Sequence, residues 1–80
     1  MHQSESSGYL RDLGFLLREI AVKAKRDRDE ALDDPDLAFL EGRLSALHEV
    51  VSLMQEQAVA FGIESEALAL GDIDPDRDLL

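Results

Sequence analysis

The stretch that decides the fold is LAFLEGRLSALHEVVSLMQEQAVAF, residues 37–61. Apolar side chains recur in it at spacings that alternate between three and four residues, which keeps them on one face of an α-helix. This main ladder consists of Leu37, Leu40, Leu44, Leu47, Val51, Met54, Ala58 and Phe61. Such a seam packs against other helices by inserting each side chain between four residues of its neighbour. The pattern therefore predicts that helices assemble, whatever the protein does.

A first helix is predicted before this stretch, over residues 8–32. Tyr9 and Leu16 widen its apolar stripe on one side. The stripe itself has the same spacing and consists of Leu10, Leu13, Leu17, Ile20 and Ala24. Asp34 is a favourable N-cap and Pro35 a favourable first residue, so the second helix is expected over 35–61, with Gly62 as its C-terminal cap. So short a connection places the two helices side by side and antiparallel.

The remaining segments carry weaker signals. Residues 1–7 are polar and serine-rich and are expected to form a disordered tail. Residues 63–71 are expected to add a short helical turn, and residues 72–80 an acidic tail exposed to solvent. The folded unit is thus expected to be a helical hairpin over residues 8–62, and both tails are expected to be dispensable for folding.

The second helix has a further ladder at the same spacing, beside the first. Its members are Phe39, Arg43, Ala46, Val50, Leu53, Gln57 and Ala60. Only one ladder can be buried against the first helix, so this second ladder faces water unless another chain covers it. The sequence therefore predicts an all-α, antiparallel two-helix hairpin that completes its core as a homo-oligomer, most simply a dimeric four-helix bundle. The second ladder is the predicted oligomer interface.

Two contacts between copies are compatible with this pattern. In one, the second helix pairs antiparallel with its own copy about a two-fold axis near Val50. In the other, the small residues Ala38, Gly42 and Ala46 allow a close approach of two backbones. The sequence leaves both open.

Composition limits the classes of partner. The 80 residues carry a formal charge of −10, which repels nucleic acid and anionic lipid, so neither kind of partner is expected. The longest apolar runs are four residues long, far below the roughly 18 that span a bilayer. The first residues do not resemble a secretory signal, and a cytoplasmic location is expected.

Residue patterns that bind metals are incomplete. His48 and Glu49 begin a zinc-protease signature, but Ser52 occupies the place of the second histidine. Asp72, Asp74 and Asp76 have the spacing of calcium ligands, but the required glycine is absent. No cofactor or metal is predicted. The least favoured hypothesis is a metal site that two chains build from His48 with Glu41, Glu49 or Glu56.

The basic residues are concentrated in one place, at Lys23, Lys25, Arg26 and Arg28. Acidic residues alternate with them, and we interpret the cluster as favourable charge at the C-terminal end of a helix. The leading functional hypothesis is a non-enzymatic protein-interaction module, an adaptor or regulatory subunit that binds itself and leaves room for another protein partner. The alternative is an antitoxin-like or immunity-like neutraliser of a basic partner.

Overall fold

The computed structural model describes residues 2–80, with side chains from Glu5 onward. Helix α1 spans His2–Glu30 and helix α2 spans Leu37–Ala60. A 3₁₀ helix, η1, spans Ser65–Leu68, and a short helix, α3, spans Pro75–Asp78. Every regular element within the described residues is helical. None of these helices combines the length and the apolarity needed to cross a membrane.

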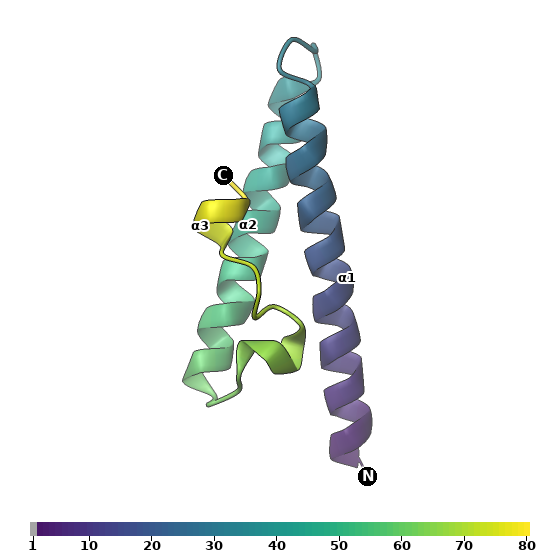
Figure 1. Cartoon of the computed structure of the whole chain (residues 1–80), viewed down its shortest axis with the longest axis vertical. Coiled ribbons are helices and arrows are strands. Elements are labelled where there is room, and N and C mark those ends of the chain that lie inside the picture. Colours follow the sequence, from purple (N-terminus) through teal and green to yellow (C-terminus); the bar gives the residue numbers. More distant parts are fainter. Residues whose placement is uncertain (1) are drawn as a thin grey trace.

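The two long helices form the predicted antiparallel hairpin. They lie close together at the connecting loop and farther apart at the other end, where η1 lies between them (Figure 1). The molecule is elongated, with dimensions of 50 × 20 × 17 Å. The all-helical hairpin expected from the ladder is therefore confirmed.

The core confirms most of the main ladder. Leu44, Val51 and Ala58 are buried on α2, whereas Phe61 at the end of the ladder is 75% exposed. On α1 the buried line is rotated from the predicted stripe, because Ala21 is fully buried and Ile20 is 43% exposed. The rotation arises because α1 packs against η1 as well as α2.

The expected acidic tail over 72–80 is wrong. Ile73, Pro75 and Leu79 are buried, and Leu79 is only 1% exposed. The apolar side chains of this segment enter the core, except that of Leu80, which is 62% exposed, and its acidic side chains do not. We call residues 65–80 the C-terminal segment, and its buried apolar side chains are Leu68, Leu70, Ile73 and Leu79.

The N-terminal boundary also differs from the prediction. A disordered tail was expected over residues 1–7, but α1 already begins at His2. Met1 lies outside the described residues. Ser6 and Ser7 are therefore helical residues, and α1 extends about 1.7 turns beyond the predicted start at 3.6 residues per turn.

The loop after α1 uses Asp34 differently from the expected N-cap. The Asp34 carboxylate accepts a hydrogen bond from the Asp36 N–H at 2.8 Å, which closes a turn within the loop. Helix α2 begins after this turn, at Leu37 rather than Pro35. Its end follows the prediction, because Gly62 has φ of 68°. The Gly62 and Ile63 N–H groups donate to the carbonyls of Val59 and Ala58, so α2 ends in a Schellman motif.

Gly14 permits the closest contact between α1 and the C-terminal segment. It is buried, and a Cβ atom at this position would lie 1.8 Å from the Leu68 carbonyl oxygen. Real Cβ atoms do not approach a backbone oxygen this closely, so only glycine allows η1 to pack here. By contrast, a Cβ atom at Gly8 or Gly42 would meet nothing within 4 Å.

Replacing Gly14 with alanine is expected to destabilise the fold because η1 must move away from α1. The expected loss is about 1–3 kcal/mol of unfolding free energy, the range for overpacking a filled core. Gly8→Ala is the matched control, and it is expected to be neutral or to stabilise by up to about 1 kcal/mol. Urea unfolding of both variants checks this, and equal effects at the two positions would contradict the close contact.

Candidate interaction surface

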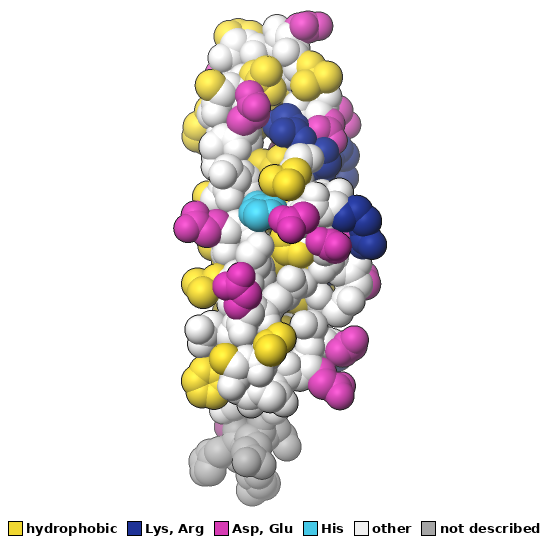
Figure 2. Space-filling model, turned by 90° about the vertical axis from the view of Figure 1, so that its left-hand side faces the viewer, with side chains coloured by type: hydrophobic (Ala, Val, Ile, Leu, Met, Phe, Trp, Pro, Cys, Tyr) yellow, Lys and Arg dark blue, Asp and Glu magenta, His cyan; other side chains and the backbone are white. Residues whose placement is uncertain are grey.

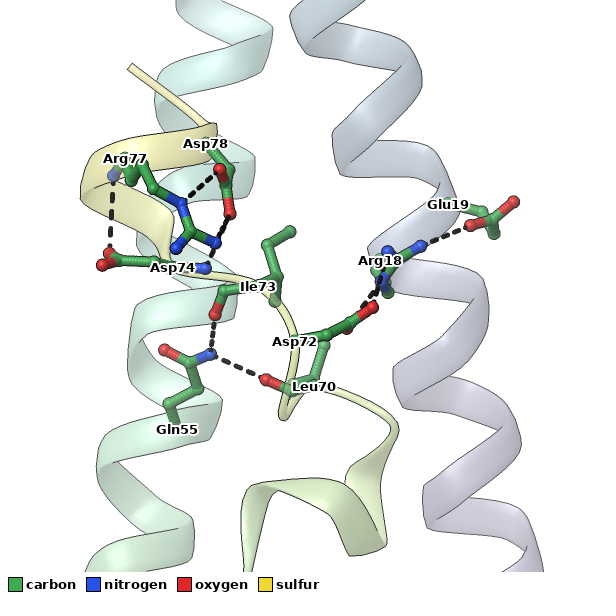
Figure 3. Close-up of polar contacts among 9 residues, drawn as sticks. All are labelled: Arg18, Glu19, Gln55, Leu70, Asp72, Ile73, Asp74, Arg77 and Asp78. Carbon is green, nitrogen blue, oxygen red and sulfur yellow. Dashed lines mark hydrogen bonds and ion pairs between the residues drawn. The ribbon is translucent and has the colours of Figure 1, made fainter.

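The hairpin has two faces, and the C-terminal segment covers one of them. Gln55 on α2 holds this segment with both hydrogens of its side-chain amide (Figure 3). Its Nε2 atom donates to the Leu70 carbonyl at 3.1 Å and to the Ile73 carbonyl at 2.8 Å. The amide therefore satisfies two main-chain acceptors that lie beside buried side chains. We call this side of the hairpin the covered face.

Charged side chains of α1 hold the same segment from the other side. Arg18 makes a two-point contact with the Asp72 carboxylate, with Nε–Oδ1 at 3.0 Å and Nη2–Oδ2 at 2.8 Å (Figure 3). The hydrogen bond from Arg18 lowers the pKa of Asp72 below its usual value. Lys25 and Arg28 donate to the main-chain oxygen of Leu80 at 2.8 and 3.0 Å. Two members of the basic cluster thus contact the C-terminal segment, a role beyond compensating the helix dipole.

Helix α3 is stabilised by its own acidic residues. The Asp74 carboxylate accepts hydrogen bonds from the Asp76 and Arg77 N–H groups, and Pro75 is the first helical residue. Asp78 accepts from the Asp74 N–H at 2.9 Å and pairs with Arg77. The Arg77 hydrogen bond is the main cause that lowers the pKa of Asp78 to about 2.

The residues considered for metal binding lie apart from one another. Asp72 contacts Arg18, Asp74 caps α3, and Asp76 Oδ1 lies 2.8 Å from Nε2 of His48. Among the residues whose side chains are described, no group of three His, Cys, Asp or Glu side chains could hold a metal ion. His48 is on the covered face, where its imidazole connects α2 to α3.

Among the residues that the structure describes, no segment covers the other side of the hairpin. On α2 it is formed by the second ladder, in which Phe39 is 71%, Leu53 55% and Val50 39% exposed. Ala46, Gln57 and Ala60 are exposed as well, and Arg43 is partly buried. In Figure 2, hydrophobic side chains recur along the left-hand edge of the molecule above the grey atoms, with an acidic side chain among them. The predicted interface residues thus share one surface that the single chain leaves uncovered.

Helix α1 contributes a second row to this surface. Tyr9, Leu16 and Ile20 are 67%, 50% and 43% exposed, and their spacing places them on the same helix face as Asp27. Asp27 Oδ2 lies 3.3 Å from Nη1 of Arg43, a member of the second ladder. This ion pair joins the two rows on one side of the hairpin. We call both rows together the open face.

The charge of the open face differs from that of the whole chain. Its one carboxylate, Asp27, pairs with Arg43 and, at 2.7 Å, with Lys23 on the adjoining row of α1. The hydrogen bond from Lys23 is the main cause that lowers the pKa of Asp27. The residues of the two rows therefore carry no net negative charge in a chain of formal charge −10, although the exposed acidic residues Asp12 and Glu49 border them.

Comparison with known proteins supplies no relationship. No protein-family model, no curated protein and no solved structure matched the chain significantly. The functional argument therefore depends on the geometry of the chain itself.

Sequence reasoning identified the α2 row of the open face but missed the residues that form the covered face. Gln55 and Gly14 have no pattern that marks them, since each is a single polar or small residue within a helix. A usable signal was present at Asp74 and Pro75, which are a favourable N-cap and first helical residue. That signal predicts a helix within the presumed tail.

Gln55→Glu is expected to release the C-terminal segment locally. A carboxylate cannot donate to the Leu70 and Ile73 carbonyls, and an unsatisfied buried acceptor costs about 1–3 kcal/mol. Hydrogen exchange of residues 65–80 should accelerate accordingly. Gln57→Glu is the control, because it adds the same charge to α2 on the open face. Unchanged protection of residues 65–80 in Gln55→Glu would contradict the proposed role of the amide.

The contribution of Asp72 to docking is expected to disappear in acid. Its pKa in the folded state lies below the ordinary value of 3.8, so its stabilisation is fully present above pH 3.8 and is lost as the pH falls through the folded-state pKa. The difference in melting temperature between the parent chain and Asp72→Asn should therefore shrink on acidification. Asp33→Asn, in the exposed loop, controls for the change in formal charge. A difference that is constant across the pH series would contradict the Arg18 contact.

Proposed function

We propose that this chain is a small, non-enzymatic protein-interaction module, an adaptor or regulatory subunit that acts as a homo-oligomer. The observation that carries the proposal is the open face. Apolar side chains from two helices lie there at regular spacing, and no described part of the chain covers them. Contiguous apolar surfaces of this kind are typical of protein interaction sites.

The polar contacts support a structural rather than a catalytic role for the ionisable groups. Asp72 and Asp78 each engage a partner within the chain, and both partnerships hold the C-terminal segment or α3 in place. His48 and Asp76 do the same between α2 and α3. These groups are used to close the covered face, which leaves the open face as the surface available for function.

The dimensions of the hairpin suit a stable interface. Its two longest dimensions are 50 × 20 Å, so a face of this outline projects roughly 1,000 Å², and standard interfaces bury about 800 Å² per partner. Aromatic residues such as Tyr9 and Phe39 are enriched in interfaces relative to the rest of a protein surface.

Val50→Glu tests the proposal against a matched control. Val50 and Val22 are both 39% exposed valines within long helices, but Val22 lies outside the two rows of the open face. Val50→Glu is expected to weaken self-association roughly 100-fold, since an unpaired charge in an apolar contact costs about 3 kcal/mol. Val22→Glu is expected to leave self-association unchanged.

Sedimentation velocity measures the oligomeric state, and circular dichroism confirms that each variant is folded. A folded monomer for the unmodified chain would contradict the proposal. Equal effects of the two glutamates would show that self-association does not depend on the open face.

A further inference from the structure

We propose that the open face binds a second copy of this chain with both interhelical loops at the same end, so that α1 of each copy packs against α2 of the other. This inference rests on the proposed function and specifies its partner and geometry. The four long helices then form one bundle, with a C-terminal segment on each outer side.

Charge favours a second copy as the occupant. Two chains of formal charge −10 repel each other over most of their surfaces. On the open face the one carboxylate, Asp27, is already within ion-pair distance of Lys23 and Arg43. Within its two rows, two copies can therefore meet without an unpaired acidic group, because Asp27 is the one carboxylate there.

The Asp27–Arg43 contact fixes which residues of α1 and α2 lie at the same level. In an antiparallel pair, residues at one level have numbers with a constant sum, here about 70, because both helices rise 1.5 Å per residue. Ile20 therefore lies level with Val50, and Tyr9 with Phe61. The open face is charged near the loop, at Asp27 and Arg43, and apolar over most of the rest of its length, where Gln57 is the one polar member of the two rows.

When both loops lie at the same end of the dimer, the residues at each level of one copy lie opposite the residues at the same level of the second copy. Asp27 then faces Arg43 of the second copy, and Arg43 faces Asp27, so each charge gains a second partner of opposite sign. Ile20 faces Val50 of the second copy, and Tyr9 faces Phe61. Charged residues thus face charged residues of the second copy, and apolar residues face apolar residues.

The opposite arrangement, with a two-fold axis at Val50 that reverses one copy, brings unlike levels together. Asp27 and Leu13 lie seven residues to either side of Ile20, so Asp27 would face Leu13 of the second copy. Arg43 would face Gln57. This arrangement places the Asp27 carboxylate against an apolar side chain, where its loss of solvent is not compensated by a new partner, and it gives Arg43 a neutral partner in place of a carboxylate.

Single cysteines distinguish the two arrangements, because the chain has no cysteine of its own. Ile20→Cys and Val50→Cys are made separately, mixed, allowed to exchange subunits and oxidised. The proposed arrangement predicts a disulfide between the two variants and little disulfide in either variant alone. A disulfide within Val50→Cys alone overturns it in favour of the reversed arrangement. No cross-link in a dimer overturns the open face as the interface, and a monomer overturns the proposed function itself.

A charge exchange gives an independent readout. In Asp27→Arg, or in Arg43→Asp, two like charges face each other within the chain and across the interface, so each variant alone should dimerise poorly. A mixture of the two variants restores opposite charges across the interface and is expected to form heterodimers at least 10-fold more readily than either homodimer. Absence of this rescue overturns the proposed pairing of levels.

Discussion

The contact on which the rest of the structure depends is the approach of the Leu68 carbonyl to Gly14. Because position 14 has no side chain, η1 can lie against α1 at the end of the hairpin where the two long helices diverge. This placement commits the chain that follows to the covered face. Leu70 then reaches a fully buried position, and Gln55 binds the two carbonyls beside it. A hairpin of two helices, which has little core of its own, thus obtains a third packing element from its own sequence.

The division into a covered and an open face follows from residue size along α1. The buried positions of α1 are small, at Gly14, Ala21 and Ala24, and leave space for leucines of the C-terminal segment. The large side chains of α1 that point elsewhere, such as Leu16 and Ile20, have no such partner. The same chain therefore covers one side of its hairpin, although Phe15 and Val59 remain exposed there, and leaves the other side with a regular apolar surface.

Sequence reasoning succeeded where the pattern was long and periodic. Leu44, Val51 and Ala58 are spaced by seven and are all buried. Side chains at this spacing lie on one side of the helix, so they are buried together when that side packs against the rest of the chain. It failed over residues 72–80, where apolar residues are few and irregular and the acidic composition suggested solvent. The Asp-Pro pairs illustrate the difference. Asp34 and Pro35 carry the stronger local signal but lie in a loop turn, whereas Asp74 and Pro75 begin α3, because Pro75 and Leu79 are buried there against α2.

Apolar burial and polar contacts play separate roles in this fold. The ion pairs that hold the C-terminal segment are largely exposed, with the Asp72 side chain 67% and the Asp76 side chain 83% accessible, and exposed pairs contribute little to stability. Attachment therefore depends on Leu70 and Leu79, which are almost fully buried. The polar groups determine register, since Arg18 and Gln55 accept only one position of the segment along the hairpin. The dimer that we propose assigns the same division to the open face, with apolar side chains providing the attraction and the Asp27–Arg43 pair distinguishing one direction of packing from its reverse.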